Sequence, residues 1–197
     1  DSHLNILIID QCSGSKDVPE NAPVFEADDI DATSKSALLS QPNVPAIEAR
    51  DLYTGRQQEH IDDAVRLLRG RGVSVDRYYV SAGFGVVAED EQLPPYEVTF
   101  SGMKADEVRD RSARLNIPRD IERLLTESAY DIVFLTMGKK YYRSINVDEA
   151  VRQITPDRIG VVFNRELVDR QYDNIVSVPA RTEDAKRHNT IVIGLKG

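Results

Sequence analysis

The chain of 197 residues has a single cysteine, Cys12, and no long hydrophobic run. One cysteine cannot form an internal disulfide, excludes a zinc site made of several cysteines, and suits a reducing compartment. No apolar stretch approaches the roughly 20 residues that cross a bilayer, and the start shows no signal-peptide pattern. We therefore expect a soluble, cytoplasmic protein without a membrane partner; no oligomeric state is indicated.

Histidine is also scarce, with three in the chain, and His60 and His188 lie in polar surroundings that indicate surface positions. A metal site needs clustered histidine, cysteine or carboxylate ligands at suitable spacings, and the sequence has no such constellation. We expect neither a metal nor another cofactor.

Lysine is the third scarce residue: the chain has 7 lysines against 18 arginines, 20 aspartates against 13 glutamates, and a net charge of -8. This balance resembles the surfaces of halophilic proteins, although an acidic protein from a GC-rich genome would share it. Acidity ordinarily argues against a nucleic-acid partner, because phosphate binding relies on basic side chains. If the acidity reflects salt adaptation, that argument is weakened.

The hydrophobic fraction of 41% is enough to close one core, and a single domain over residues 1–197 is expected. Three short apolar runs end at small residues, a pattern typical of strands buried on both faces. These runs are residues 4–10, 75–81 and 131–136, and further candidates are residues 158–163, 175–178 and 190–195.

Helical patterns lie between the runs, at residues 57–69, 105–115 and 118–128, with Pro118 at the first helical position of the last. Residues 17–45 interrupt this alternation and are expected to form a loop with a short helix around residues 33–39. The pattern predicts an α/β fold: a mostly parallel or mixed sheet flanked by helices. Such sheets bind ligands outside the carboxyl ends of their strands, where the loops after the three apolar runs would meet.

The first predicted strand is followed by Cys12, Ser13, Gly14, Ser15 and Lys16. Backbone N–H groups around a glycine, with serine and lysine side chains, form a cradle for anions, although the P-loop spacing is absent. A plain polar turn is the structural alternative. A lone cysteine after a buried strand is more often a small core residue than a nucleophile, and only Lys16 and backbone donors would favour its thiolate.

A second polar segment, Asp51 to Gln57, groups an acid, a phenol, a hydroxyl, a base and an amide around Gly55, directly before a predicted helix. Thr54 is suited to cap that helix. Capping accounts for Thr54 and Gly55 but not for Tyr53, Arg56 and Gln57 together, so capping and ligand binding are equal alternatives for this segment.

The third segment, residues 81–87, follows the second apolar run and has glycines on both sides of Phe84. Paired glycines permit a close backbone approach to a ligand as well as a tight turn. The acidic residues 89–91 are suited to general acid or base catalysis, whereas a solvated acidic loop, extending over residues 89–95, is the commoner use of such a run.

The fourth segment, residues 136–142, ends the third apolar run with Gly138, two lysines and two tyrosines. Two cations beside two aromatic rings suit a phosphate or a stacked base. The basic first turn of a surface helix is an equal alternative.

In their order and places, the four segments resemble the motifs of the YaaA peroxide-stress family. The matching stretches are Cys12 to Lys16, DLYTGRQ at residues 51–57, SAGFGVVAEDEQLPPY at residues 81–96 and TMGKKYYRS at residues 136–144. The resemblance extends from about residue 6 to residue 145, and Phe84 stands where the family usually has tyrosine. The Cys-Ser-x-x-Lys start also resembles the lysine-transfer domain of archaeosine synthase, without that domain's following Pro-Tyr and His.

The resemblance implies a YaaA-like fold and a function connected with nucleobases. YaaA-like proteins are linked to DNA binding and to protection against peroxide, and archaeosine synthase joins lysine to a modified base in tRNA. Chemistry and resemblance together give Lys16, Asp51 and Tyr53 as candidate catalytic residues. The candidate substrate-binding residues are Ser13, Gly14, Ser15, Thr54, Gly55, Gln57, Ser81, Gly85, Tyr96, Tyr141 and Ser144.

The first functional hypothesis is a pocket for a nucleoside, nucleobase or nucleotide, free or within a nucleic acid, in a transfer or hydrolytic enzyme. Lys16 would hold an anionic group, and Asp51 would act as an acid or base. The alternative is a non-catalytic DNA-binding protein of the oxidative-stress response, and a third hypothesis makes Cys12 a peroxide-reactive thiol. DNA binding predicts arginines on one face, such as Arg109, Arg111, Arg114, Arg119 and Arg123.

Overall fold

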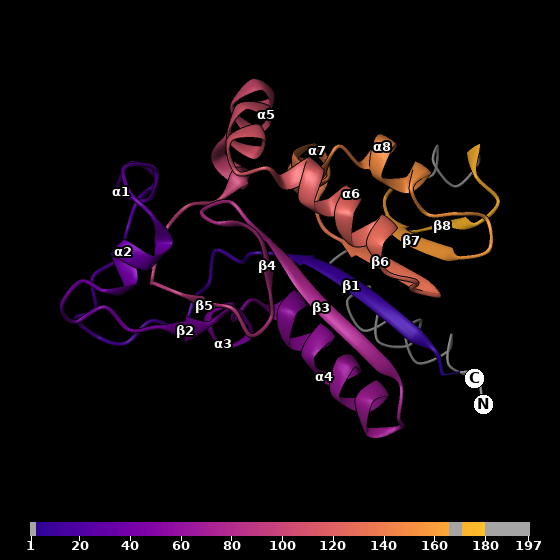
Figure 1. Ribbon diagram of the computed structural model, residues 1–197, viewed down its shortest axis with the longest axis horizontal. Coiled ribbons are helices and arrows are strands. Elements are labelled where there is room, and N and C mark those ends of the chain that lie inside the picture. The colour runs from indigo at the N-terminus through magenta and orange to yellow at the C-terminus, as the bar shows by residue number, and fades with distance from the viewer. Residues whose placement is uncertain (1–2, 166–170, 180–197) are drawn as a thin grey trace.

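A six-stranded sheet forms the centre of the computed structural model, which describes residues 3–165 and 171–179 (Figure 1). The strand order is β4-β3-β1-β6-β7-β8, and all neighbouring pairs are parallel except β3 and β4. The prediction of an α/β fold with a mostly parallel or mixed sheet is confirmed. The strands are β1 (Asn5–Gln11), β3 (Ser74–Ser81), β4 (Gly85–Ala88), β6 (Ile132–Thr136), β7 (Ile159–Phe163) and β8 (Ile175–Val178).

Helices cover both faces of this sheet (Figure 1). On one face, α4 lies across β1 and β3; the other face carries α6, α7 and α8, with α5 beside them. Among the described residues, no helix is long and apolar enough to cross a membrane. The helices are α4 (Arg56–Gly70), α5 (Ala105–Arg114), α6 (Ile117–Glu127), α7 (Lys139–Ile145) and α8 (Val147–Arg152).

The central strand β1 supplies both hydrophobic cores. Ile6 and Ile8 pack with the buried side of α4, whereas Leu7 and Ile9 belong to the larger core under α6, α7 and α8. Successive side chains of a strand point to opposite faces, so a strand covered on both sides needs apolar residues at every position. This is why residues 6 to 9 form a continuous apolar run.

The ends of two helices differ from the prediction. In α4 the N-cap is Gly55, which makes no side-chain capping bond, and Thr54 is exposed, so the expected capping role of Thr54 is wrong. In α6 the first residue is Ile117, and Pro118 therefore takes the second position. Proline is tolerated there, because the first helical N–H groups have no partner inside the helix.

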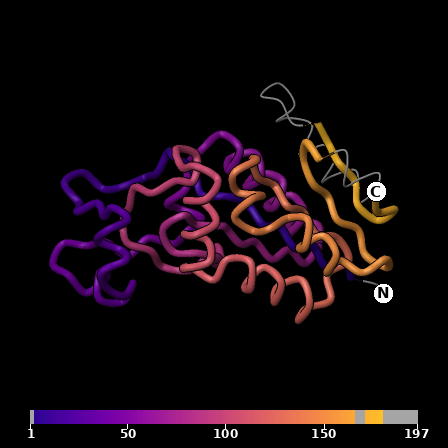
Figure 2. The backbone as a smooth tube through the Cα atoms, turned by 90° about the horizontal axis from the view of Figure 1, so that it is seen from above, coloured from indigo at the N-terminus to yellow at the C-terminus, as the bar shows by residue number. Residues whose placement is uncertain are grey.

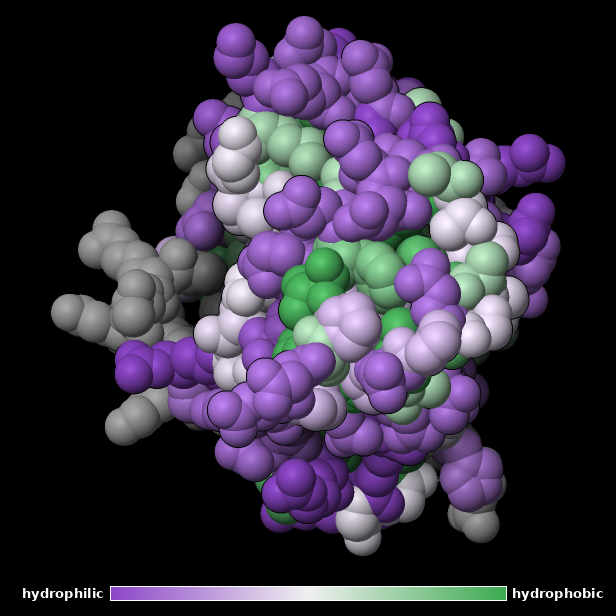
Figure 3. Space-filling view, turned by 90° about the vertical axis from the view of Figure 1, so that its left-hand side faces the viewer, coloured by the Kyte–Doolittle hydropathy of each residue, from purple (hydrophilic) through white to green (hydrophobic). Residues whose placement is uncertain are grey.

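Residues 17–48 extend from one end of the sheet, at the opposite end of the long axis from β7 and β8 (Figure 2). Seen from that end, the surface is mostly hydrophilic around a smaller hydrophobic area (Figure 3). The predicted short helix is present as α2 (Lys35–Leu39), and α1 (Ala27–Asp31) precedes it without having been predicted. A two-residue strand, β2 (Ile47–Glu48), then leads into α3 (Ala49–Leu52).

The predicted glycine loop after β3 is a hairpin. β4 turns back along β3, and Gly85 pairs with Ser81. Gly85 has φ of 82°, and an added Cβ would lie 2.9 Å from the Leu115 carbonyl oxygen, so both the turn and the packing require glycine. The predicted loop at residues 89–95 contains β5 (Gln92–Leu93), paired with β2, and η1 (Phe100–Gly102) follows. The run at residues 190–195 lies outside the described residues.

Candidate functional site

The loop after β1 lies against the end of α3, so the first two polar segments meet. The backbone N–H of Cys12 donates to the Val80 carbonyl at 2.9 Å, which continues the β1–β3 ladder. The loop then runs antiparallel to residues 52–54, with a bridge between Lys16 and Tyr53. The Thr54 N–H donates to the Ser15 carbonyl at 3.2 Å.

A group of buried polar side chains joins the four predicted segments at the carboxyl edge of the sheet. We call it the tyrosine cluster. The Tyr53 and Tyr96 hydroxyls are 2.5 Å apart, and the Ser81 hydroxyl lies 2.7 Å from that of Tyr96. These three residues are at most 1% exposed. The cluster consists of Cys12, Lys16, Tyr53, Ser81, Tyr96 and Tyr141.

Tyr141 connects the cluster to the start of α7. Its hydroxyl lies 2.9 Å from the sulfur of Cys12 and 3.2 Å from the hydroxyl of Thr99. The Phe100 N–H also donates to this hydroxyl, at 3.4 Å. Because Cys12 is buried and in hydrogen-bond contact with Tyr141, its thiol belongs to a polar network rather than to a purely apolar core.

The ammonium of Lys16 is the unmatched charge of the cluster. Its Nζ atom is buried and has no hydrogen-bond partner among the described residues. It lies 4.9 Å from the centre of the Tyr96 ring, where a cation–π contact stabilises it in part. A buried donor without an acceptor is unfavourable, so an oxygen from a bound molecule would be stabilising here.

The tyrosines of the cluster are neutral hydrogen-bonding groups near neutral pH. Burial raises the pKa of Tyr53 and of Tyr96 well above the ordinary value, and the nearby Cys12 acts in the same direction. Burial, followed by Cys12, also raises the pKa of Tyr141. These hydroxyls are therefore suited to donating or relaying hydrogen bonds, not to acting as phenolate bases.

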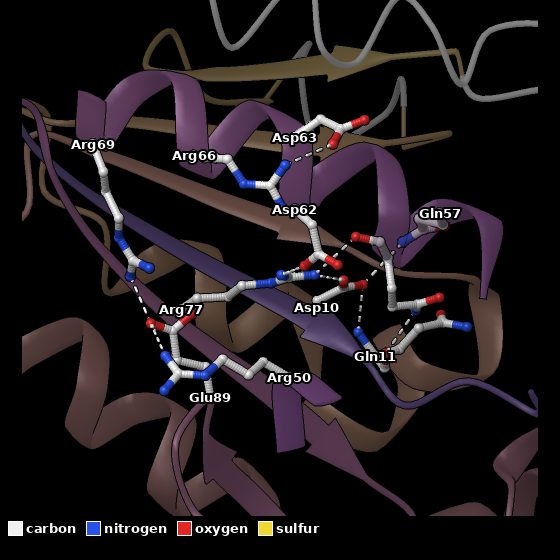
Figure 4. Close-up of polar contacts among 11 residues, drawn as sticks. Asp10, Gln11, Arg50, Gln57, Asp62, Asp63, Arg66, Arg69, Arg77 and Glu89 are labelled. Atoms are coloured by element: carbon white, nitrogen blue, oxygen red, sulfur yellow. Dashed lines mark hydrogen bonds and ion pairs between the residues drawn. The ribbon is translucent and has the colours of Figure 1, made fainter. Parts of the chain in front are cut away.

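A second buried polar group lies just before the carboxyl ends of β1 and β3 (Figure 4). Arg77 Nη2 donates to Asp10 Oδ2 at 3.1 Å, and Nη1 donates to Asp62 on α4. Gln57 donates to Asp10 Oδ1 and to the Thr136 carbonyl, both at 3.0 Å. We call Asp10, Gln57, Asp62 and Arg77 the Asp10–Arg77 group.

Burial raises the pKa of the Asp10 carboxyl, while Arg77 opposes that shift. Both side chains of this ion pair are at most 2% exposed. The Asp10–Arg77 pair was not predicted from the sequence. Its signal was present, since a charged residue within each of two buried strands needs a partner.

Not every predicted site residue joins the tyrosine cluster. Asp51 is exposed on α3 and lines a cleft beside α4, and Thr54, Gly14 and Ser15 are exposed. Gln57 belongs to the Asp10–Arg77 group, which uses both N–H bonds of its amide nitrogen.

The remaining predicted residues have packing or backbone contacts. Ser13 is buried and donates to the Ser15 carbonyl, and Gly55 approaches Ser13 so closely that an added Cβ would lie 3.0 Å from the serine Cβ. Ser144 donates to the Tyr141 carbonyl at 2.6 Å within α7. Gly85, as described above, forms the hairpin turn.

The two lysines of the fourth segment differ in their surroundings. Lys139 is exposed at the start of α7. Lys140 donates to the Ser101 and Met103 carbonyls, each at 2.7 Å, and so ties α7 to the chain before α5. Among the arginines proposed for a DNA-binding face, Arg111 is buried, donates to the Ala82 carbonyl and pairs with Asp31 at 2.9 Å. The five arginines therefore do not form one solvent-exposed face.

Two comparisons with known proteins give no relative for this chain. No protein-family model matches it, and no curated protein matches it.

Proposed function

We propose that the tyrosine cluster binds a nucleoside, nucleobase or nucleotide, free or within a nucleic acid, and that the protein is a transfer or hydrolytic enzyme. The buried ammonium of Lys16 carries this proposal, because it lacks an acceptor among the described residues. An anionic or carbonyl oxygen of a ligand would provide that acceptor.

The groups around Lys16 suit such a ligand. In the loop beside it, Gly14 and Ser15 are exposed, and nothing lies within 4 Å of the position of an added Gly14 Cβ. The hydroxyls of Tyr53, Tyr96 and Tyr141 are buried and bonded within the cluster, so a base edge would bind by exchanging some of these hydrogen bonds for its own donors and acceptors. Lys16 would stabilise an oxyanion that develops during transfer or hydrolysis. Asp51 has no part in this proposal, because it lines the cleft beside α4, which no residue of the tyrosine cluster lines.

The resemblance to the YaaA family supports the same function, since the segments that carry it supply the cluster. Lys16, Tyr53, Ser81, Tyr96 and Tyr141 come from four separate stretches of the chain. Their hydrogen bonds and ring contacts bring these stretches together at one sheet edge.

Calorimetric titration with nucleobases, nucleosides, nucleotides and short oligonucleotides tests the proposal at fixed salt. For at least one of these ligands, Lys16→Met is expected to weaken binding at least tenfold, a change of about 1.4 kcal/mol. Lys139→Met is the matched control, since Lys139 is an exposed lysine that also follows the carboxyl end of a parallel strand, and it should bind as wild type. Equal binding of every ligand by wild type and Lys16→Met would exclude the proposed pocket.

A different groove favours DNA binding as the second candidate function. Arg109, Arg143 and Arg165 line a groove of about 850 Å³ between α5, α7 and the end of β7. If this groove holds a phosphate backbone, affinity for DNA falls linearly on a plot of log K against log salt. The double variant Arg109→Gln/Arg143→Gln would lose about 2 phosphate contacts, so the slope of that plot would become shallower by about 2. Lys16→Met would leave the slope unchanged.

A further inference from the structure

A separate cleft lies between α4, α3 and the β3–β4 hairpin, on the α4 face of the sheet (Figure 4). Its volume is about 320 Å³, and it is lined by Arg50, Arg66, Arg69 and Arg77 together with three carboxylates. The lining therefore has four arginines against three carboxylates and is less acidic than the chain as a whole, which has a net charge of -8. Arginines that approach from several elements are well suited to binding an oxyanion.

The base of the cleft contains buried polar atoms that lack partners. The Arg77 side chain is 2% exposed, and its terminal nitrogens are held by Asp10, Asp62 and the Gln58 carbonyl. Its Nε atom is buried and has no acceptor among the described residues. The neighbouring Tyr79 hydroxyl is also without a partner there, and the Arg77 guanidinium lies 4.8 Å from the centre of its ring.

The rim of the cleft already holds one carboxylate between two arginines. Glu89 lies 2.7 Å from Arg69 and 3.8 Å from Arg50, and Figure 4 shows this trio beside the Arg77 side chain. Arg50 also pairs with Glu48 at 2.8 Å. Arg66, on the other side, is 79% exposed and has a pair with Asp63 at 3.7 Å, which is weak in water. The Arg66 guanidinium can therefore turn to a ligand at low energetic cost.

We propose that this cleft is a binding site for a phosphate-type oxyanion. Guanidinium groups reach it from α3, α4 and β3, and the tetrahedral oxygens of phosphate accept hydrogen bonds from several directions, whereas a carboxylate accepts mainly in one plane. The phosphate oxygens would accept hydrogen bonds from Arg66 and Arg69. The phosphate would then lie next to the Glu89 carboxylate, which stays between Arg69 and Arg50. This site is independent of the tyrosine cluster.

Inorganic phosphate and pyrophosphate are the probes, titrated by calorimetry and by thermal unfolding at constant ionic strength set with chloride. Binding is expected to be at least tenfold weaker in Arg66→Gln and in Arg69→Gln. Arg66 is exposed, so its variant tests the site without disturbing the fold. Arg123→Gln is the matched control, because Arg123 also forms an exposed pair within one helix, with Glu127 at 3.5 Å.

Lys16→Met separates this proposal from the proposed function. If the cleft binds phosphate, Lys16→Met retains wild-type affinity for both probes while the Arg66 variant loses it. The proposal is wrong if Arg66→Gln and Arg69→Gln bind the probes as wild type does. Equal stabilisation by chloride and phosphate at one ionic strength would also overturn the proposal. So would a loss of phosphate affinity that occurs in Lys16→Met but in neither arginine variant.

Discussion

The tyrosine cluster and the Asp10–Arg77 group each bury a cation near the carboxyl ends of β1 and β3, but only the second group pairs its cation with carboxylates. Arg77 is held by two carboxylates and a backbone carbonyl. The Nζ atom of Lys16 is buried beside the ring of Tyr96 and has no acceptor among the described residues. A fully buried cation that is paired with carboxylates contributes to the fold, whereas a buried one without an acceptor is available to a ligand. Substitutions at the two positions should therefore have different effects.

Arg77→Met is expected to cause the largest change, lowering the free energy of unfolding by about 3–5 kcal/mol. Without the guanidinium, the carboxylate of Asp10 remains fully buried and loses its opposite charge. Urea unfolding at neutral pH measures the effect.

The controls for this prediction separate a buried ion pair from an ordinary arginine contact. Arg152→Met removes an exposed pair with Glu149 and should cost under about 1 kcal/mol. Asp10→Asn with Arg77→Met removes both charges, and its loss should be smaller than the sum of the two single losses. A loss below about 1 kcal/mol for Arg77→Met would show that the pair does not stabilise the fold.

Tyr96→Phe is expected to have an intermediate effect, a loss of about 1–3 kcal/mol at neutral pH. The hydroxyl of Tyr96 contacts those of Tyr53 and Ser81, and its removal leaves the buried Tyr53 hydroxyl without this partner. Tyr172→Phe is the control, since Tyr172 is half-buried and its hydroxyl accepts from the exposed Arg152. That variant should change stability by less than about 0.5 kcal/mol.

The same substitution should alter the response to alkaline pH. The pKa of Tyr96 in the folded protein lies well above 10.0, its value in an unfolded chain. The unfolded chain therefore loses this proton first, so the stability from neutral Tyr96 is present below pH 10 and lost as pH rises further. Tyr96→Phe should flatten the fall by up to about 1.4 kcal/mol per pH unit, measured by urea unfolding between about pH 8 and 11. If the variant loses stability with rising pH as steeply as wild type, then a group other than Tyr96 causes the alkaline loss of stability.

The sheet was predictable because buried strands and amphipathic helices leave periodic signals. The run at residues 4–10 became β1, and the face with Ile61, Ala64, Val65 and Leu68 became the buried side of α4. Short elements left no such signal: α1 has five residues and β5 has two, too few to show a period. β4 was missed because its glycine suggested a ligand loop, whereas Gly85 serves the turn.

The candidate site was predictable as a set of residue types but not as a set of contacts. Motif order indicated that Lys16, Tyr53, Tyr96 and Tyr141 belong together, and hydrogen bonds and a ring contact do connect all four segments. Proximity in sequence was misleading for Asp51, two residues before Tyr53, because Asp51 lines the cleft beside α4 and does not join the tyrosine cluster. The Asp10–Arg77 pair joins residues 67 positions apart, a separation that no local pattern reports.

Lys16→Met is expected to have the smallest effect on stability, within about 1 kcal/mol of wild type. The unfavourable burial of an ammonium without an acceptor is relieved, and the loss of the cation–π contact with Tyr96 offsets this gain. Lys140→Met provides the contrast, because Lys140 has two carbonyl partners and its removal should cost about 1–2 kcal/mol. Urea unfolding of both variants beside wild type measures the difference. If Lys16→Met proves less stable than Lys140→Met, then the Lys16 ammonium is matched within the folded protein, and the distinction between the two buried cations fails.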